Sequence, residues 1–164
     1  MYFIIKNLLG GLIKLNISVL NRLRVSCQNI SQRYYKQIYV CEYELGNNVA
    51  YFSKENHYSL VNVNLLLSEK IKELPQNRRP YKVAEILYEF INAAESETIC
   101  IDYYEMLFDP SLRINPFDLF TNLSKSKTLI ITWRGNIEDN YFIYAEPGHP
   151  EYIKYSTKDA IIIK

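Results

Sequence analysis

Short apolar segments of five to eight residues alternate with helical segments along most of this chain. Four of them are rich in the β-branched and aromatic residues that favour strands; they span residues 37–44, 60–65, 98–102 and 128–133. Such strands, separated by helices, predict β-α-β units in which a mostly parallel sheet is buried on both faces. We therefore expect a three-layer α/β fold, in which a strand at residues 141–144 pairs antiparallel in a C-terminal hairpin.

The helices are predicted from the spacing of apolar residues and from capping residues. Apolar positions recur every three or four residues from residue 16 to residue 30, which indicates a polar helix with one apolar stripe. Residues 49–58 fit either a short helix or a hairpin strand, and the helix is favoured. Ser68 is expected to cap a helix that runs to about Leu74. The remaining helices are expected at residues 83–91 and 116–124.

Length and charge restrict the classes of protein that fit the chain. Its 164 residues suit one domain, and 19 Lys plus Arg against 18 Asp plus Glu give a formal charge of +1. This balance argues against duplex DNA binding by phosphate neutralisation, which needs a surplus of cations. Cys27, Cys41 and Cys100 lie far apart and form no CxxC pair, so a reduced, cytoplasmic chain without a zinc site is expected.

The first 30 residues are interpreted as an amphipathic helical leader, and residues 31–164 as the domain proper. Lys6 and Lys14 interrupt the apolar residues near the N-terminus. No stretch therefore approaches the roughly 20 apolar residues that a transmembrane helix requires. The alternative interpretation of this leader is a peripheral membrane anchor.

Ligands of open α/β sheets bind beyond the carboxyl ends of the strands, so each strand end is a candidate site. A phosphate-binding loop after the first strand needs glycines and a lysine in GxxxxGK[ST] spacing. That spacing is absent from residues 42–54, where Glu42 and Glu44 add negative charge. The degenerate loop keeps only Gly46, Asn47, Asn48 and Lys54. No cofactor and no metal are therefore expected, with ATP and Mg²⁺ kept as the alternative.

Charged residues follow two further strands. Asp102 ends a buried strand and Glu105 follows three residues later, an arrangement typical of the acidic strand end that holds magnesium or orients water in nucleotide hydrolases. Arg134 follows the strand at 128–133 and is a candidate phosphate sensor, as are Arg78 and Arg79 in a basic loop. The structural alternatives are an aspartate that turns the chain and arginines that are simply exposed.

Two segments interleave cations with aromatic residues, at residues 33–36 and 152–155. Such patterns can stack on single-stranded bases. With 15 tyrosines in the chain such neighbours also arise by chance. Nucleic acid is therefore a less favoured partner than protein.

Several motifs together resemble the BrxF family, the small P-loop proteins of type 3 BREX phage-defence systems. The resemblance covers about residues 31 to 156 and is most specific in Ala145–Tyr152. The motifs are Val61-Asn62-Val63-Asn64-Leu65, Leu67-Ser68, Arg79-Pro80, Ile101-Asp102, Glu105, Leu107-Phe108-Asp109-Pro110, Asn115-Pro116, Thr128-Leu129, Trp133 and Tyr144-Ala145-Glu146-Pro147-Gly148-His149-Pro150-Glu151-Tyr152.

This resemblance implies a P-loop NTPase-like fold and a role among other proteins of a bacterial antiviral system. It places Asp102 in the acidic strand-end role with Glu105 close by, but it does not extend to the phosphate loop. The expected function is a non-catalytic component that acts through contacts with other defence proteins or as a homo-oligomer. The alternatives are an ATPase that uses Arg78, Arg79 or Arg134 in place of the lost lysine, and a nucleic-acid-binding defence component.

Overall fold

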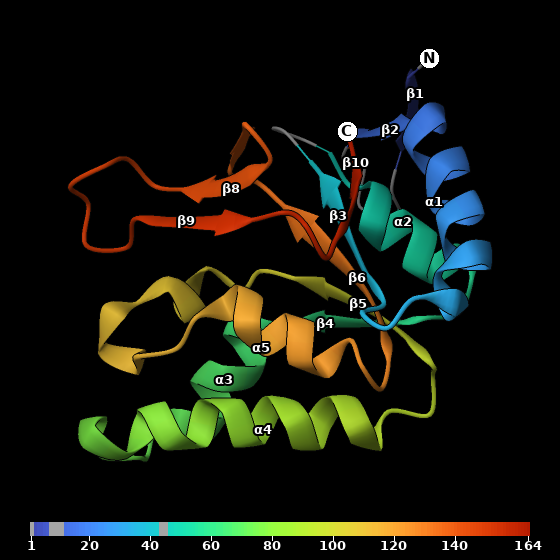
Figure 1. Ribbon diagram of the computed structural model, residues 1–164. Helices are drawn as coiled ribbons and strands as arrows, with labels where there is room; N and C mark the ends of the chain where they lie inside the picture. The colour runs from blue at the N-terminus through green and yellow to red at the C-terminus, as the bar shows by residue number, and fades with distance from the viewer. Residues whose placement is uncertain (1, 7–11, 43–45) are drawn as a thin grey trace.

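Five parallel strands form the central sheet of the computed structural model, which describes residues 2–6, 12–42 and 46–164, with side chains from residue 15 (Figure 1). Their order across the sheet is β10-β3-β6-β5-β4. This confirms the expected α/β class and the parallel sheet. The strands are β3 (Gln37–Cys41), β4 (Ser59–Asn62), β5 (Thr98–Asp102), β6 (Thr128–Trp133) and β10 (Ile161–Ile163).

Helices cover both faces of this sheet. Successive side chains of a strand point to opposite faces, and in these strands both sets are apolar and need a helix to bury them. Val40 and Ile130 pack with apolar residues of α1 and α2, whereas Tyr39 and Ile131 pack with those of α3, α4 and α5. The result is three layers. The helices are α1 (Ile17–Asn29), α2 (Asn48–Glu55), α3 (Val63–Ile71), α4 (Arg79–Ala93) and α5 (Pro116–Leu123), with 3-10 turns at Ile30–Gln32, Gln76–Arg78, Glu105–Phe108 and Pro110–Leu112.

A second, antiparallel sheet lies between β6 and β10 in the chain and contains the expected hairpin. Its strands pair in the order β7-β8-β9. Phe142 of β8 fixes it to the core, with ring centroids 4.4 Å from Tyr39 and 4.9 Å from Phe117. The strands are β7 (Asn136–Glu138), β8 (Tyr141–Tyr144) and β9 (Ile153–Ser156).

The N-terminal region differs from the expected helical leader. β1 (Tyr2–Lys6) and β2 (Leu12–Asn16) pair antiparallel, and only then does α1 begin. Asn16 starts the helix because its side chain accepts hydrogen bonds from the backbone N–H groups of Ser18 and Val19. α1 buries Leu20 and Leu23 against the sheet. In the part of the chain that the structure describes, no helix is long and apolar enough to span a membrane.

The start of α3 also differs from its prediction. The helix begins at Val63 rather than at Ser68, and the preceding strand β4 ends at Asn62. The cap is Asn62, whose side chain accepts a hydrogen bond from the backbone N–H of Leu65 at 2.9 Å. Ser68 lies inside the helix and donates its hydroxyl to the carbonyl of Leu65. The sequence does not single out Asn62 as the cap, because Asn62 lies within an apolar run that itself fits a strand.

Candidate functional site

The candidate site lies where the carboxyl ends of β3, β6 and β5 meet. These strands are adjacent in the sheet, but β3 leads to α2 on one face while β5 leads to α5 on the other. Ligands of open α/β sheets bind where such connections diverge. Glu42 follows β3, Asp102 ends β5 and Arg134 follows β6, so the sheet brings three charged residues to one edge.

Arg134 and Asp102 form a two-pronged ion pair. Nη1 of Arg134 lies 2.6 Å from Oδ1 of Asp102, and Nη2 lies 3.1 Å from Oδ2. The Asp102 side chain is 6% exposed, and that of Arg134 is 34% exposed. Burial opposes the charge on Arg134, but the hydrogen bonds and charge of Asp102, together with the charges of Glu105 and Glu42, outweigh it, so the pKa of Arg134 is raised. The predicted acidic residue and sensor arginine are therefore brought together, and they neutralise each other.

Two further groups hold Arg134 in place. Its Nη1 lies 3.6 Å from Oε1 of Glu105, and its guanidinium carbon lies 4.9 Å from the centre of the Tyr103 ring. Arginine stacks favourably on aromatic rings in this way. Glu105 is predicted to lie close to Asp102, and in the structure the two carboxylates face the same arginine.

Asn64 positions the turn that carries Glu105. Its side chain donates to Oε2 of Glu105 and accepts from the backbone N–H of Met106, both at 3.0 Å. Its own N–H donates to the carbonyl of Tyr103 at 2.6 Å. Tyr103 has a φ of 49°, a left-handed conformation uncommon outside glycine. No local pattern in the sequence points to this role of Asn64, because its contacts join segments about 40 residues apart.

The side chain of Glu42 reaches the start of α2. This side chain is buried, and Oε1 accepts a hydrogen bond from the backbone N–H of Val49 at 2.7 Å. Burial is the main cause that raises the pKa of Glu42, and the charge of Asp102 adds to it, while the Val49 N–H and Arg134 act in the opposite direction. The first N–H groups of such a helix are the usual donors to a bound phosphate. Here a carboxylate of the protein takes one of them.

The other residues of the degenerate loop serve the fold. Asn48 is buried, and its Oδ1 accepts the backbone N–H of Asn16 at 2.7 Å, which ties α2 to the end of β2. The backbone carbonyl of Asn47, which follows Gly46, accepts the N–H of Tyr51 in the first turn of α2. Lys54 is exposed in the last turn, six residues and about 9 Å along the helix from its start. Glu44 lies outside the described residues.

Arg78 and Arg79 are not part of this cluster. They lie at the junction of a 3-10 turn and α4, where Nε of Arg79 donates to the carbonyl of Leu74 at 3.2 Å. Among the residues that the structure describes, no hydrogen bond or ion pair joins either arginine to Asp102, Glu105 or Arg134.

A small aromatic cavity of about 240 Å³ lies beside Arg134. Phe108 and Tyr144 stack at 3.7 Å on its wall. A Cβ atom on Gly135 would lie 2.4 Å from the Trp133 ring, so only glycine fits there. The cavity is smaller than the roughly 300–1,000 Å³ typical of ligand pockets. It is lined by Tyr104, Glu105, Phe108, Thr132, Trp133, Arg134, Gly135 and Tyr144.

The geometry favours a closed, internally paired site. Within residues 2–6, 12–42 and 46–164, no group of three His, Cys, Asp or Glu side chains is placed to hold a metal ion. The Asp102 carboxylate is paired with Arg134, and the Glu42 carboxylate accepts the Val49 N–H at the start of α2. Comparison of the chain with protein-family models, curated proteins and solved structures finds no match.

Proposed function

We propose that this protein is a P-loop NTPase-like component of a bacterial phage-defence system of the BREX type that works without bound nucleotide. It acts in the cytoplasm through contacts with other defence proteins or with copies of itself. The observation that carries the proposal is the Glu42 carboxylate on the Val49 N–H, at the position where a phosphate would otherwise lie. The resemblance to the BrxF family supplies the biological setting.

The strand order supports a framework related to phosphate-binding proteins. β3 lies at the point where the connections diverge and leads directly into α2, which is the usual location of a phosphate site in open α/β sheets. Three carboxylates lie at this edge, on Glu42, Asp102 and Glu105, and among the residues that the structure describes Arg134 is the cation that pairs with the last two. An incoming polyphosphate therefore meets carboxylates at this edge.

Exposed apolar side chains support a role in protein contacts. Leu60 on β4 and Leu65 on α3 are 45% and 56% exposed, and β4 is an edge strand of the central sheet. Tyr81 on α4 is 78% exposed. Aromatic side chains are enriched in protein interfaces, and open strand edges invite pairing with another chain.

Isothermal titration tests the nucleotide-free state. We expect no binding when the purified protein is titrated with ATP and Mg²⁺, because Glu42 and Arg134 fill the positions that phosphate and magnesium need. The matched variant Glu42→Ala frees the Val49 N–H and shows whether the carboxylate is what blocks an anion. Micromolar ATP binding by the wild type, with turnover that Asp102→Asn abolishes, contradicts the proposal and supports the ATPase alternative.

A further inference from the structure

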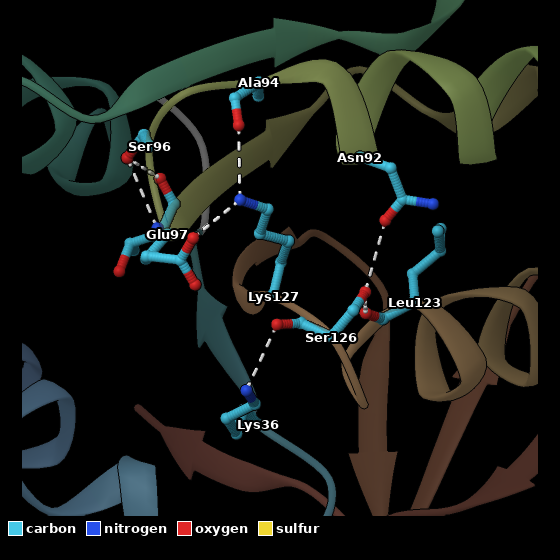
Figure 2. A network of polar contacts seen from close by, with 9 residues as sticks. Lys36, Asn92, Ala94, Ser96, Glu97, Leu123, Ser126 and Lys127 are labelled. Carbon is cyan, nitrogen blue, oxygen red and sulfur yellow. Dashed lines mark hydrogen bonds and ion pairs between the residues drawn. The ribbon is translucent and has the colours of Figure 1, made fainter.

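Basic side chains gather at the opposite edge of the sheet, where β3 and β6 begin. Figure 2 shows how three loops meet there through lysines. Nζ of Lys36 donates to the carbonyl of Ser126 at 3.2 Å. Nζ of Lys127 donates to the carbonyl of Ala94 at 3.2 Å and to a carboxylate oxygen of Glu97 at 2.8 Å. Lys36 keeps further donor capacity, because an ammonium group has three N–H donors and only one is used. The Lys127 side chain is only 12% exposed, so it joins the loops rather than facing solvent.

The charge of this edge is positive although the chain is nearly neutral. Four cations lie in these loops, on residues 33, 36, 125 and 127, against the two carboxylates of Glu95 and Glu97. The hydrogen bond from Lys127, followed by the charges of Lys127 and Lys36, lowers the pKa of Glu97. Glu97 thus offsets part of the charge of Lys127, while Arg33 and Lys125 have no ion pair with a carboxylate among the described residues.

An exposed aromatic pair lies among these cations. Tyr34 is 71% exposed, and the Tyr35 ring meets it edge-on with centroids 4.8 Å apart. Nζ of Lys125 lies 6.0 Å and 5.8 Å from the two ring centres and donates to the Asn122 side chain. A large flat ring beside several ammonium groups matches a nucleotide, whose base stacks and whose phosphate is anionic.

We propose that this basic–aromatic edge, formed by Arg33, Tyr34, Tyr35, Lys36 and Lys125, binds single-stranded nucleic acid. A base stacks on Tyr34, and the sugar-phosphate chain crosses Arg33, Lys36 and Lys125. A single strand is favoured over a duplex because its bases are free to stack on the ring and because the positive charge is small and local. This binding does not depend on the proposed function, since Glu42 and Asp102 lie at the other edge of the sheet.

Fluorescence anisotropy with labelled 20-nucleotide oligo(dT) and oligo(U) tests the proposal on the full chain. If Arg33, Lys36 and Lys125 each contact a phosphate, raising salt from about 50 to about 200 mM weakens binding roughly 20-fold, and Lys125→Ala reduces this loss to roughly sevenfold. Tyr34→Ala weakens binding about fivefold or more through lost stacking. Both side chains are exposed, so the variants keep the fold, which circular dichroism verifies.

The matched controls are Tyr81→Ala and Lys70→Ala. Tyr81 is even more exposed than Tyr34 but lies near the opposite end of α4 from these loops, and Lys70 is an exposed lysine of α3. Both variants bind like the wild type. The proposal is overturned by absence of oligonucleotide binding at the lower salt concentration or by wild-type affinity of Tyr34→Ala. Binding of polyglutamate in place of oligonucleotides also overturns it and assigns the edge to an acidic protein.

Discussion

Arg134 is the residue on which the carboxyl edge depends most. Removing it leaves the buried Asp102 carboxylate without its partner. Breaking buried ion pairs costs roughly 3–5 kcal/mol, and because one third of the Arg134 side chain is exposed we expect about 2–3 kcal/mol for Arg134→Ala. Urea unfolding of the wild type and the variant measures this difference.

The exposed pair Lys82–Glu85 provides the control for this prediction. Its side chains are 48% and 47% exposed, so Lys82→Ala is expected to cost about 0.5 kcal/mol or less. Equal losses for Arg134→Ala and Lys82→Ala would show that Asp102 does not need its arginine. Partial recovery in the double variant Arg134→Ala with Asp102→Asn is expected, since it removes the uncompensated charge.

At the scale of single elements, α3 offers a direct test of how a helix begins. Asn62→Ala removes the side-chain oxygen that accepts the Leu65 N–H, and such caps contribute about 1 kcal/mol. Ser68→Ala, at the position that the sequence favours as the cap, is expected to change stability by less than about 0.5 kcal/mol because Ser68 lies inside the helix. Thermal or urea unfolding separates the two; a larger loss for Ser68→Ala contradicts the observed start of α3.

The sequence was sufficient for elements whose signal is local. β3, β5 and β6 are apolar runs bounded by polar residues, and α4 shows an apolar stripe at helical spacing. β10 cannot be predicted as a strand of the main sheet from the sequence. Three isoleucines are too short a run to indicate a strand, and only their pairing with β3 makes them one. The strands β1, β2 and β9 are likewise defined by their pairing with other strands rather than by a local pattern in the sequence.

The same distinction holds for the candidate site. Asp102 and Arg134 are predictable from the sequence, because polar residues at the ends of buried strands meet at one edge of a parallel sheet. From the sequence, Glu42 is expected only to repel anions, because its hydrogen bond with Val49 depends on the path of the chain between β3 and α2. Asn64 gave no local signal either.

At the scale of the whole molecule, Glu42 makes stability depend on pH. Its pKa is raised above the ordinary value of 4.5, so the folded chain holds this proton more tightly than the unfolded chain. Between those two pKa values, rising pH ionises Glu42 at a cost to the folded state, and this cost persists at higher pH. Glu42→Gln cannot ionise, so its stability relative to the wild type is expected to grow from pH 4 to pH 7.

Urea unfolding at several pH values checks this trend. Glu69→Gln, at an exposed position of α3, is the control and is expected to show no such growth. A Glu42→Gln variant that loses stability relative to the wild type as the pH rises would show that the ionised carboxylate stabilises α2 more than its burial costs.

The pairing of β10 with β3 also affects how the protein is made. β3 is the first strand of the main sheet to be synthesised and β10 the last, with about 120 residues between them (Figure 1). During translation one side of β3 therefore stays without its neighbour while every other strand of that sheet emerges. Closing so long a loop is slow, and an unpaired strand edge is prone to aggregate. The side of β3 that β10 covers is thus open to chaperones and to aggregation until the three isoleucines of β10 have been synthesised.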